Sequence, residues 1–205
     1  MLDLHPPARV VAALLDGVRD DQLSDPTPCA RYPVAALLDH LMGLTTAFTL
    51  AARKSTAAEA LAGESRPGEA SAAHLSPGWR TELPRRLRGL AEAWQDPGAW
   101  EGMAAAGGVT LPADVMGAVA VDELVIHGWD LARATGQRFT CDAASTQAVF
   151  TFTSIAARPE EAEGRQGVFG PVVEVPADAP LLERALGLSG RDPAWSPQGA
   201  QHPTR

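Results

Sequence analysis

The chain has 205 residues, of which 45% are hydrophobic and 20% are charged, a balance typical of one globular domain with a tail. The net charge of −8 provides no basic surface to neutralise phosphates, which argues against nucleic acid or an anionic membrane as a partner. No basic segment followed by an apolar core opens the chain, and no apolar run approaches about eighteen residues, so we expect a cytoplasmic protein. The cysteines, Cys29 and Cys141, lie far apart and predict neither a disulfide framework nor a cysteine-type zinc site.

Two helices are predicted in the first quarter of the chain. The apolar positions of residues 6–18 recur at helical spacing, and a loop rich in aspartate and proline follows over residues 20–28. Pro33 suits the start of a second helix that we expect to reach about residue 52 and to carry His40 at the rim of its apolar face. A histidine in such a position is more often a structural residue than a ligand, and that alternative stays open.

The middle of the chain is predicted to contain a long loop and a third helix. Residues 54–78 carry little periodicity, and we expect a loop with a short helical piece near residues 57–61. Large apolar residues at helical spacing then predict a helix with Pro84 in its first turn and a solvated face of arginines. These apolar residues are Leu83, Leu87, Leu90 and Trp94. Gly107 and Gly108 indicate a tight turn before the next helix.

A single long helix is predicted between Pro112 and Gly136, because no other proline interrupts this stretch. At 100° per residue, Glu123, His127 and Asp130 fall on one otherwise apolar stripe of that helix. Burying such groups without partners costs roughly 2–7 kcal/mol each. A bound metal ion would satisfy the glutamate and the histidine. A Glu–His–Asp hydrogen-bond ladder or a solvated stripe is the alternative.

The C-terminal part of the chain is predicted to be less regular. Asp142 is a candidate N-cap for a helix that ends near Ala156. Residues 158–205 are rich in glutamate, glycine and proline, and a short helix is expected near residues 181–186. We therefore divide the chain into a metal-binding helix bundle, residues 1–157, and a C-terminal extension, residues 158–205, that packs on the bundle.

Four sequence blocks carry a resemblance to a known family. The first runs from Asp25 to Gly43, and the second and most specific runs from Asp122 to Gly136 with the pattern Glu-x-x-x-His-x-Trp-Asp. The others are Val168-Phe169-Gly170-Pro171 and Gly190-Arg191-Asp192-Pro193. Together the blocks resemble the mycothiol-dependent maleylpyruvate isomerase-like proteins of the DinB superfamily, as a single-domain branch.

The resemblance implies an all-α fold, a DinB-like four-helix bundle with long connecting loops and an irregular C-terminal extension. It further implies a divalent metal, zinc first, bound through His40, Glu123 and His127, with mycothiol as the co-substrate thiol. Two histidines and one carboxylate would leave an open coordination position, as in catalytic zinc sites. Asp130 is a candidate to orient a ligand histidine or to hold substrate. One departure is Tyr32, which stands where a tryptophan is common in the family.

Two function classes follow. The first is an enzyme, a metal- and thiol-dependent transferase or isomerase acting on a small electrophile, and a homodimer is compatible with it. The second is a non-catalytic metal- or thiol-binding protein. Full-length maleylpyruvate isomerases carry a second α/β domain, and residues 158–205 are too few for one, which puts the isomerase activity in question. A purely structural bundle with no metal is the third reading.

Overall fold

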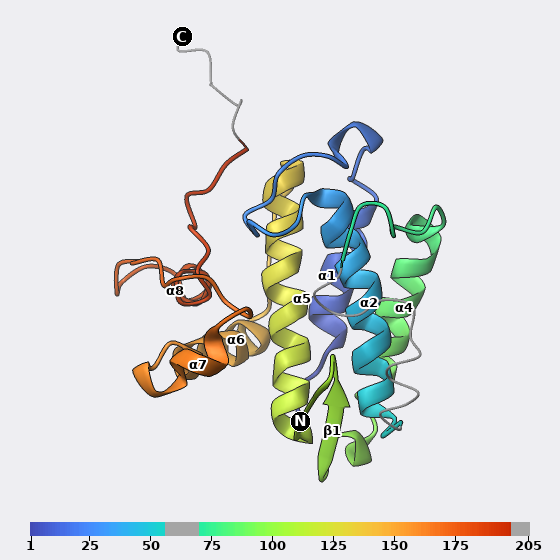
Figure 1. Ribbon diagram of the computed structural model, residues 1–205, viewed down its shortest axis with the longest axis vertical. Helices are drawn as coiled ribbons and strands as arrows, with labels where there is room; N and C mark the ends of the chain where they lie inside the picture. Colours follow the sequence, from blue (N-terminus) through green and yellow to red (C-terminus); the bar gives the residue numbers. More distant parts are fainter. Residues whose placement is uncertain (56–69, 198–205) are drawn as a thin grey trace.

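Four long helices pack side by side around one apolar core (Figure 1). They are α1 (His5–Leu15), α2 (Val34–Ala52), α4 (Trp79–Ala93) and α5 (Ala113–Thr135). Both α1 and α2 contact α4 on one side and α5 on the other, which closes the bundle. The structure is a computed structural model that describes residues 1–55 and 70–197. The predicted all-α bundle is confirmed, while the helical piece expected near residues 57–61 lies outside the described residues.

The helix α5 has the ends that the sequence predicts. Pro112 occupies the N-cap, and Gly136 adopts a left-handed conformation with φ of 72° at the C-terminal end. Glycine reaches this conformation without the clash that a Cβ would cause, so the helix stops there. The 23 residues of α5 therefore form one uninterrupted rod that spans the bundle.

The helix α4 differs from its prediction because it begins earlier than Leu83. Its first residue is Trp79, which is buried and extends the apolar stripe by a turn. Pro84 consequently lies inside the helix, where its missing N–H cannot bond to the carbonyl of Arg80. The arginine face is also only partly solvated, since Arg86 donates to Thr46 Oγ1 on α2 at 2.9 Å.

The helix α2 is long and apolar enough to cross a membrane by length and composition alone. In the structure, 83% of its most apolar window is buried inside the protein. It is therefore a helix of the bundle core. His40 is buried on this helix, where the sequence predicted a rim position.

Short elements connect the helices. The strands β1 (Met103–Ala106) and β2 (Val109–Pro112) form an antiparallel hairpin before α5. Gly107 and Gly108 make its two-residue turn with φ of 59° and 83°, the backbone of a type I′ turn. Among the described residues, three 3-10 helices lie in the loops: η1 (Asp20–Gln22), η2 (Pro97–Trp100) and η3 (Pro159–Glu161).

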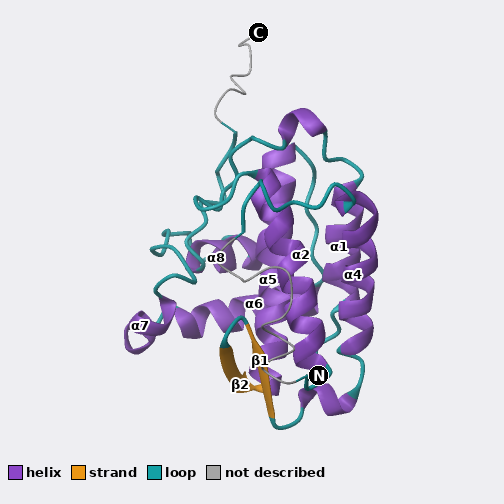
Figure 2. Ribbon diagram, turned by 45° about the vertical axis from the view of Figure 1, so that its right-hand side comes forward, coloured by secondary structure: helices purple, strands orange, loops and turns teal. Residues whose placement is uncertain are grey.

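The C-terminal helices lie on the side of α5 away from α2 and α4, as Figures 1 and 2 show. They are α6 (Ala143–Ala156), α7 (Ala162–Arg165) and α8 (Leu181–Leu188). The helix α6 contacts both α5 and α8. Irregular segments before and after α8 return toward α5. Arg165 ties the segment before α8 to the end of α8 by donating to the carbonyls of Gly170 and Leu188.

Candidate metal centre

The helices α2 and α5 bring the three predicted ligands together. His40 Nε2 and His127 Nε2 each lie 3.2 Å from Glu123 Oε2, although His40 and Glu123 are 83 residues apart in the chain. The two imidazole rings meet edge to face with centroids 4.7 Å apart. Both histidine side chains are 9% exposed and that of Glu123 is 23% exposed, so the group opens to solvent on one side only.

The geometry of this group fits a small divalent ion. In a tetrahedral zinc site with bonds of about 2.0–2.1 Å, neighbouring ligand atoms are separated by roughly 3.3 Å. The two separations of 3.2 Å match that edge, and all three ligand atoms lie within 4.8 Å of one another. Two imidazole nitrogens and a carboxylate oxygen are also a donor set that zinc prefers. These three residues could therefore hold an ion without any large movement.

Opposing charges set the protonation of the group. Burial tends to raise the pKa of Glu123, but the hydrogen bonds and charges of His127 and His40 outweigh burial and hold that pKa well below its usual range. Burial tends to lower the pKa of His127, but hydrogen bonds to Asp130 and Glu123 raise it to about 10. Burial and the nearby Glu123 raise the pKa of the Asp122 carboxyl well above its usual range. Without an ion, Glu123 is an anion that pairs with an imidazolium.

Asp130 supports His127 from the side opposite Glu123. Its Oδ2 accepts a hydrogen bond from His127 Nδ1 at 2.9 Å and another from Arg191 Nη2 at 3.1 Å. Asp130 is fully buried, and its side chain bonds to His127 and Arg191. His40 lacks an equivalent support, because its Nδ1 has no hydrogen-bond partner in the described ranges 1–55 and 70–197.

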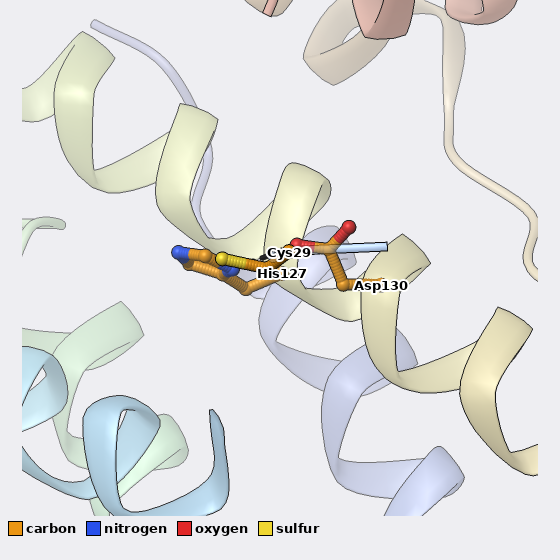
Figure 3. Close-up of side chains that lie close together, drawn as sticks. All are labelled: Cys29, His127 and Asp130. Carbon is orange, nitrogen blue, oxygen red and sulfur yellow. Dashed lines mark hydrogen bonds and ion pairs between the residues drawn. The ribbon is translucent and has the colours of Figure 1, made fainter. Parts of the chain in front are cut away.

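A second group of ligand-type atoms shares His127. Cys29, on the loop before α2, places its sulfur within 4.8 Å of ligand atoms of His127 and Asp130 (Figure 3). The positive charge of Arg191 argues against a cation at this second group. Asp130 is already paired with the guanidinium of Arg191, and a cation beside that guanidinium would be repelled. We therefore do not assign a second metal site to this group, in which Asp130 bonds to His127.

A cavity of about 550 Å³ lies over the three candidate ligands. Its walls come from the loop before α2, from α2 and α5, and from the C-terminal segments around Phe169 and Arg191. Tyr32 stacks on His40 with ring centroids 5.0 Å apart. Tyr32 therefore provides the large aromatic surface at the position where a tryptophan was expected. The cavity size falls within the range of small-molecule sites, roughly 300–1,000 Å³.

Comparison with known proteins shows the family of the chain. The family described as the mycothiol maleylpyruvate isomerase N-terminal domain matches residues 4–132, more than half of the chain. The chain belongs to this family. Its relatives include uncharacterized proteins of two Mycobacterium tuberculosis strains, each 31% identical over 142 residues. That alignment covers 64% of this chain and 64% of each relative. No solved structure matches the chain.

The family match ends at residue 132, and the sequence predicted that residues 158–205 pack on the bundle without indicating which of them reach the site. Arg191 is buried against Asp130, and Phe169 lines the cavity. Both residues belong to short sequence blocks that contributed to the family resemblance. No hydrophobic periodicity in these blocks indicated where the two side chains would lie. For Arg191, the one available sequence signal of a buried role was an arginine that follows a glycine in an otherwise irregular segment.

Metal affinity is expected to fall as the pH falls. Because the pKa of His127 is raised to about 10, its Nε2 carries a proton below that pH, and a metal ion must displace it. We expect the affinity for zinc to rise about tenfold per pH unit between about pH 7 and 8.5, with about one proton released. The paired imidazolium stabilises the metal-free fold fully below about pH 6.5, and this stability is lost as the pH approaches 10. Calorimetric titration in buffers of different ionisation enthalpy measures the released proton, and a pH-independent affinity would contradict this assignment.

Proposed function

We propose that this protein binds a divalent metal ion, zinc first, through His40, Glu123 and His127, and acts as a metal- and thiol-dependent transferase or isomerase on a small electrophile. The observation that carries the proposal is the convergence of three ligand atoms, with separations of 3.2 Å, beneath a cavity of about 550 Å³. Membership of the mycothiol maleylpyruvate isomerase N-terminal domain family supports mycothiol as the thiol.

The chemistry that we propose divides between the ion and the protein. A bound divalent ion with an open position lowers the pKa of a coordinated thiol or water toward neutrality. Glu123 and His127 supply one negative charge and one oriented nitrogen, and Asp130 fixes the direction of that nitrogen. Tyr32 and Phe169 form apolar walls that reduce the water around the reacting groups.

The substrate and the cellular setting are also proposals. The cavity suits a small-molecule thiol together with a small electrophile, and we infer a cytoplasmic protein that binds neither nucleic acid nor membranes. The chain spans 64% of the length of the curated relatives that it matches, so the activity in the family's name is not carried over to it unchanged. Residues 167–171 and 190–191 complete the cavity wall, which supports a working site formed by this chain.

A thiol-dependence assay tests the proposed activity. Zinc-loaded protein is incubated with mycothiol and a panel of aromatic halides, epoxides and unsaturated carbonyl compounds, and loss of the electrophile is followed. We expect turnover that requires both zinc and mycothiol and that falls to the uncatalysed rate in Glu123→Gln. Glu82→Gln is the matched control, because Glu82 pairs with Arg86 on α4 away from the cavity.

The same assay separates the two function classes. Turnover in wild type and in the Glu82→Gln control, but not in Glu123→Gln, supports the enzyme. Stoichiometric zinc binding without turnover of any electrophile would overturn the catalytic proposal and leave a non-catalytic metal- or thiol-binding protein.

A further inference from the structure

Asp130 connects the candidate metal centre to the C-terminal segment of the chain. Its Oδ2 accepts from His127 Nδ1 on α5 and from Arg191 Nη2, while its Oδ1 lies 3.4 Å from Arg191 Nε. Arg191 follows α8 and stands 61 residues away in the sequence. Asp130 is 0% exposed and Arg191 is 7% exposed, so this chain of contacts is shielded from solvent.

The position of Arg191 is fixed by its surroundings. Its Nη1 donates to the carbonyl of Ser189 at 3.2 Å, and its backbone N–H donates to the carbonyl of Leu186 at 2.9 Å. Gly190 has a φ of 84°, and a Cβ there would lie 2.7 Å from the backbone of Gly170. The guanidinium therefore reaches Asp130 only when the segments around residues 170 and 190 pack together beside α5.

The guanidinium has two effects on the carboxylate that it contacts. It neutralises a charge that would be costly to bury, and its planar fork holds the carboxylate plane in one orientation. A carboxylate fixed in this way accepts the Nδ1 proton of His127 and leaves Nε2 directed at Glu123 and His40. A lysine would supply the charge without the fork.

We propose that Arg191 is a positioning residue of the metal centre, acting on His127 through Asp130, so that docking of residues 167–195 and binding of a divalent ion are coupled. The inference rests on the metal site proposed above. Coupling of this kind is reciprocal: a docked segment strengthens metal binding, and a bound ion stabilises the docked segment by the same factor. The C-terminal segment is then a working part of the centre as well as a wall of its cavity.

A double-mutant cycle tests this coupling. Cobalt(II) is titrated into metal-free wild type, Arg191→Met, Asp130→Asn and the double variant, and the visible absorption of the bound ion reports both affinity and coordination geometry. We expect Arg191→Met to weaken binding about tenfold or more and to alter the cobalt spectrum. The double variant should bind no more than about twofold more weakly than the weaker single variant, because both changes interrupt one chain of contacts.

Two further variants separate positioning from general damage. Arg184→Met is the matched control, because Arg184 lies on α8 and its guanidinium stacks on Phe150 away from Asp130. We expect it to bind cobalt as wild type does. Arg191→Lys should fold, as checked by circular dichroism, and lose less affinity than Arg191→Met. Hydrogen exchange of residues 167–195 should slow on adding zinc to wild type but not to Arg191→Met.

The outcomes distinguish this inference from the proposed function. Wild type that takes up no cobalt or zinc would overturn the metal site itself. The inference alone would be overturned if wild type binds cobalt and if Arg191→Met and Arg191→Lys bind it with the affinity and the visible spectrum of wild type. Additive losses in the double variant would also overturn it, because they would mean that Arg191 does not act through Asp130.

Discussion

Replacing both Glu123 and His127 by alanine is expected to abolish divalent-metal binding. Wild-type protein purified without a histidine tag should carry about one equivalent of zinc or another divalent ion, while the double variant should carry none. The change leaves His40 as the one remaining member of the group whose ligand atoms lie within 4.8 Å of one another. A single imidazole cannot replace the three protein ligands that catalytic zinc sites use. Elemental analysis and zinc titration measure the loss.

A matched pair of changes outside the group controls for general effects. His5 pairs with Asp3, and Glu82 pairs with Arg86, both away from the cavity. His5→Ala combined with Glu82→Ala removes the same residue types and should keep the metal. If the Glu123 and His127 variant retained one equivalent, the ion would lie elsewhere. If wild type failed to take up zinc, nickel or manganese, the three residues would be a hydrogen-bond ladder in a structural bundle.

Asp130→Ala is expected to cause the largest loss of stability among single changes around the site. The substitution leaves the guanidinium of Arg191 and the imidazolium of His127 without their shared carboxylate, and both the Asp130 and Arg191 side chains are less than a tenth exposed. Breaking a buried pair by removing one partner typically costs about 3–5 kcal/mol. We expect a decrease of this size in the free energy of unfolding of the metal-free protein, measured by urea denaturation.

The companion variant isolates the cause of that loss. Adding Arg191→Met to Asp130→Ala removes the uncompensated charge and leaves an apolar side chain of similar length. The double variant should therefore recover a large part of the lost stability. A loss below about 1 kcal/mol in Asp130→Ala would mean that solvent or another group already satisfies Arg191, which contradicts the buried pair.

The helices that build the site could be predicted because their signals are local. Pro112 and Gly136 bound α5, and the spacing of Glu123 and His127 places them on one face of it. The start of α4 was predicted wrongly because its local signal, the proline, was outweighed by tertiary packing. Pro84 indicates a first turn from sequence alone, but burial of Trp79 on the core extends the helix ahead of the proline.

The contacts between distant segments could not be predicted from local patterns. His40 was grouped with Glu123 and His127 by residue type and by the family resemblance, since helical spacing gives no register between α2 and α5. Arg191 follows irregular sequence, and its role depends on the close approach of Gly170 and Gly190. Such a contact is set by tertiary packing. Its partner Asp130 was predicted to orient a ligand histidine or to hold substrate, and no local pattern paired it with Arg191.

The most direct test of the central claim is an anomalous diffraction map, recorded at the zinc absorption edge from crystals of zinc-loaded protein. We predict one strong peak about 2.0–2.2 Å from His40 Nε2, a Glu123 carboxylate oxygen and His127 Nε2. A peak at the sulfur of Cys29 beside Asp130, or no peak above His40 and Glu123, would contradict the assignment of this group as the metal centre.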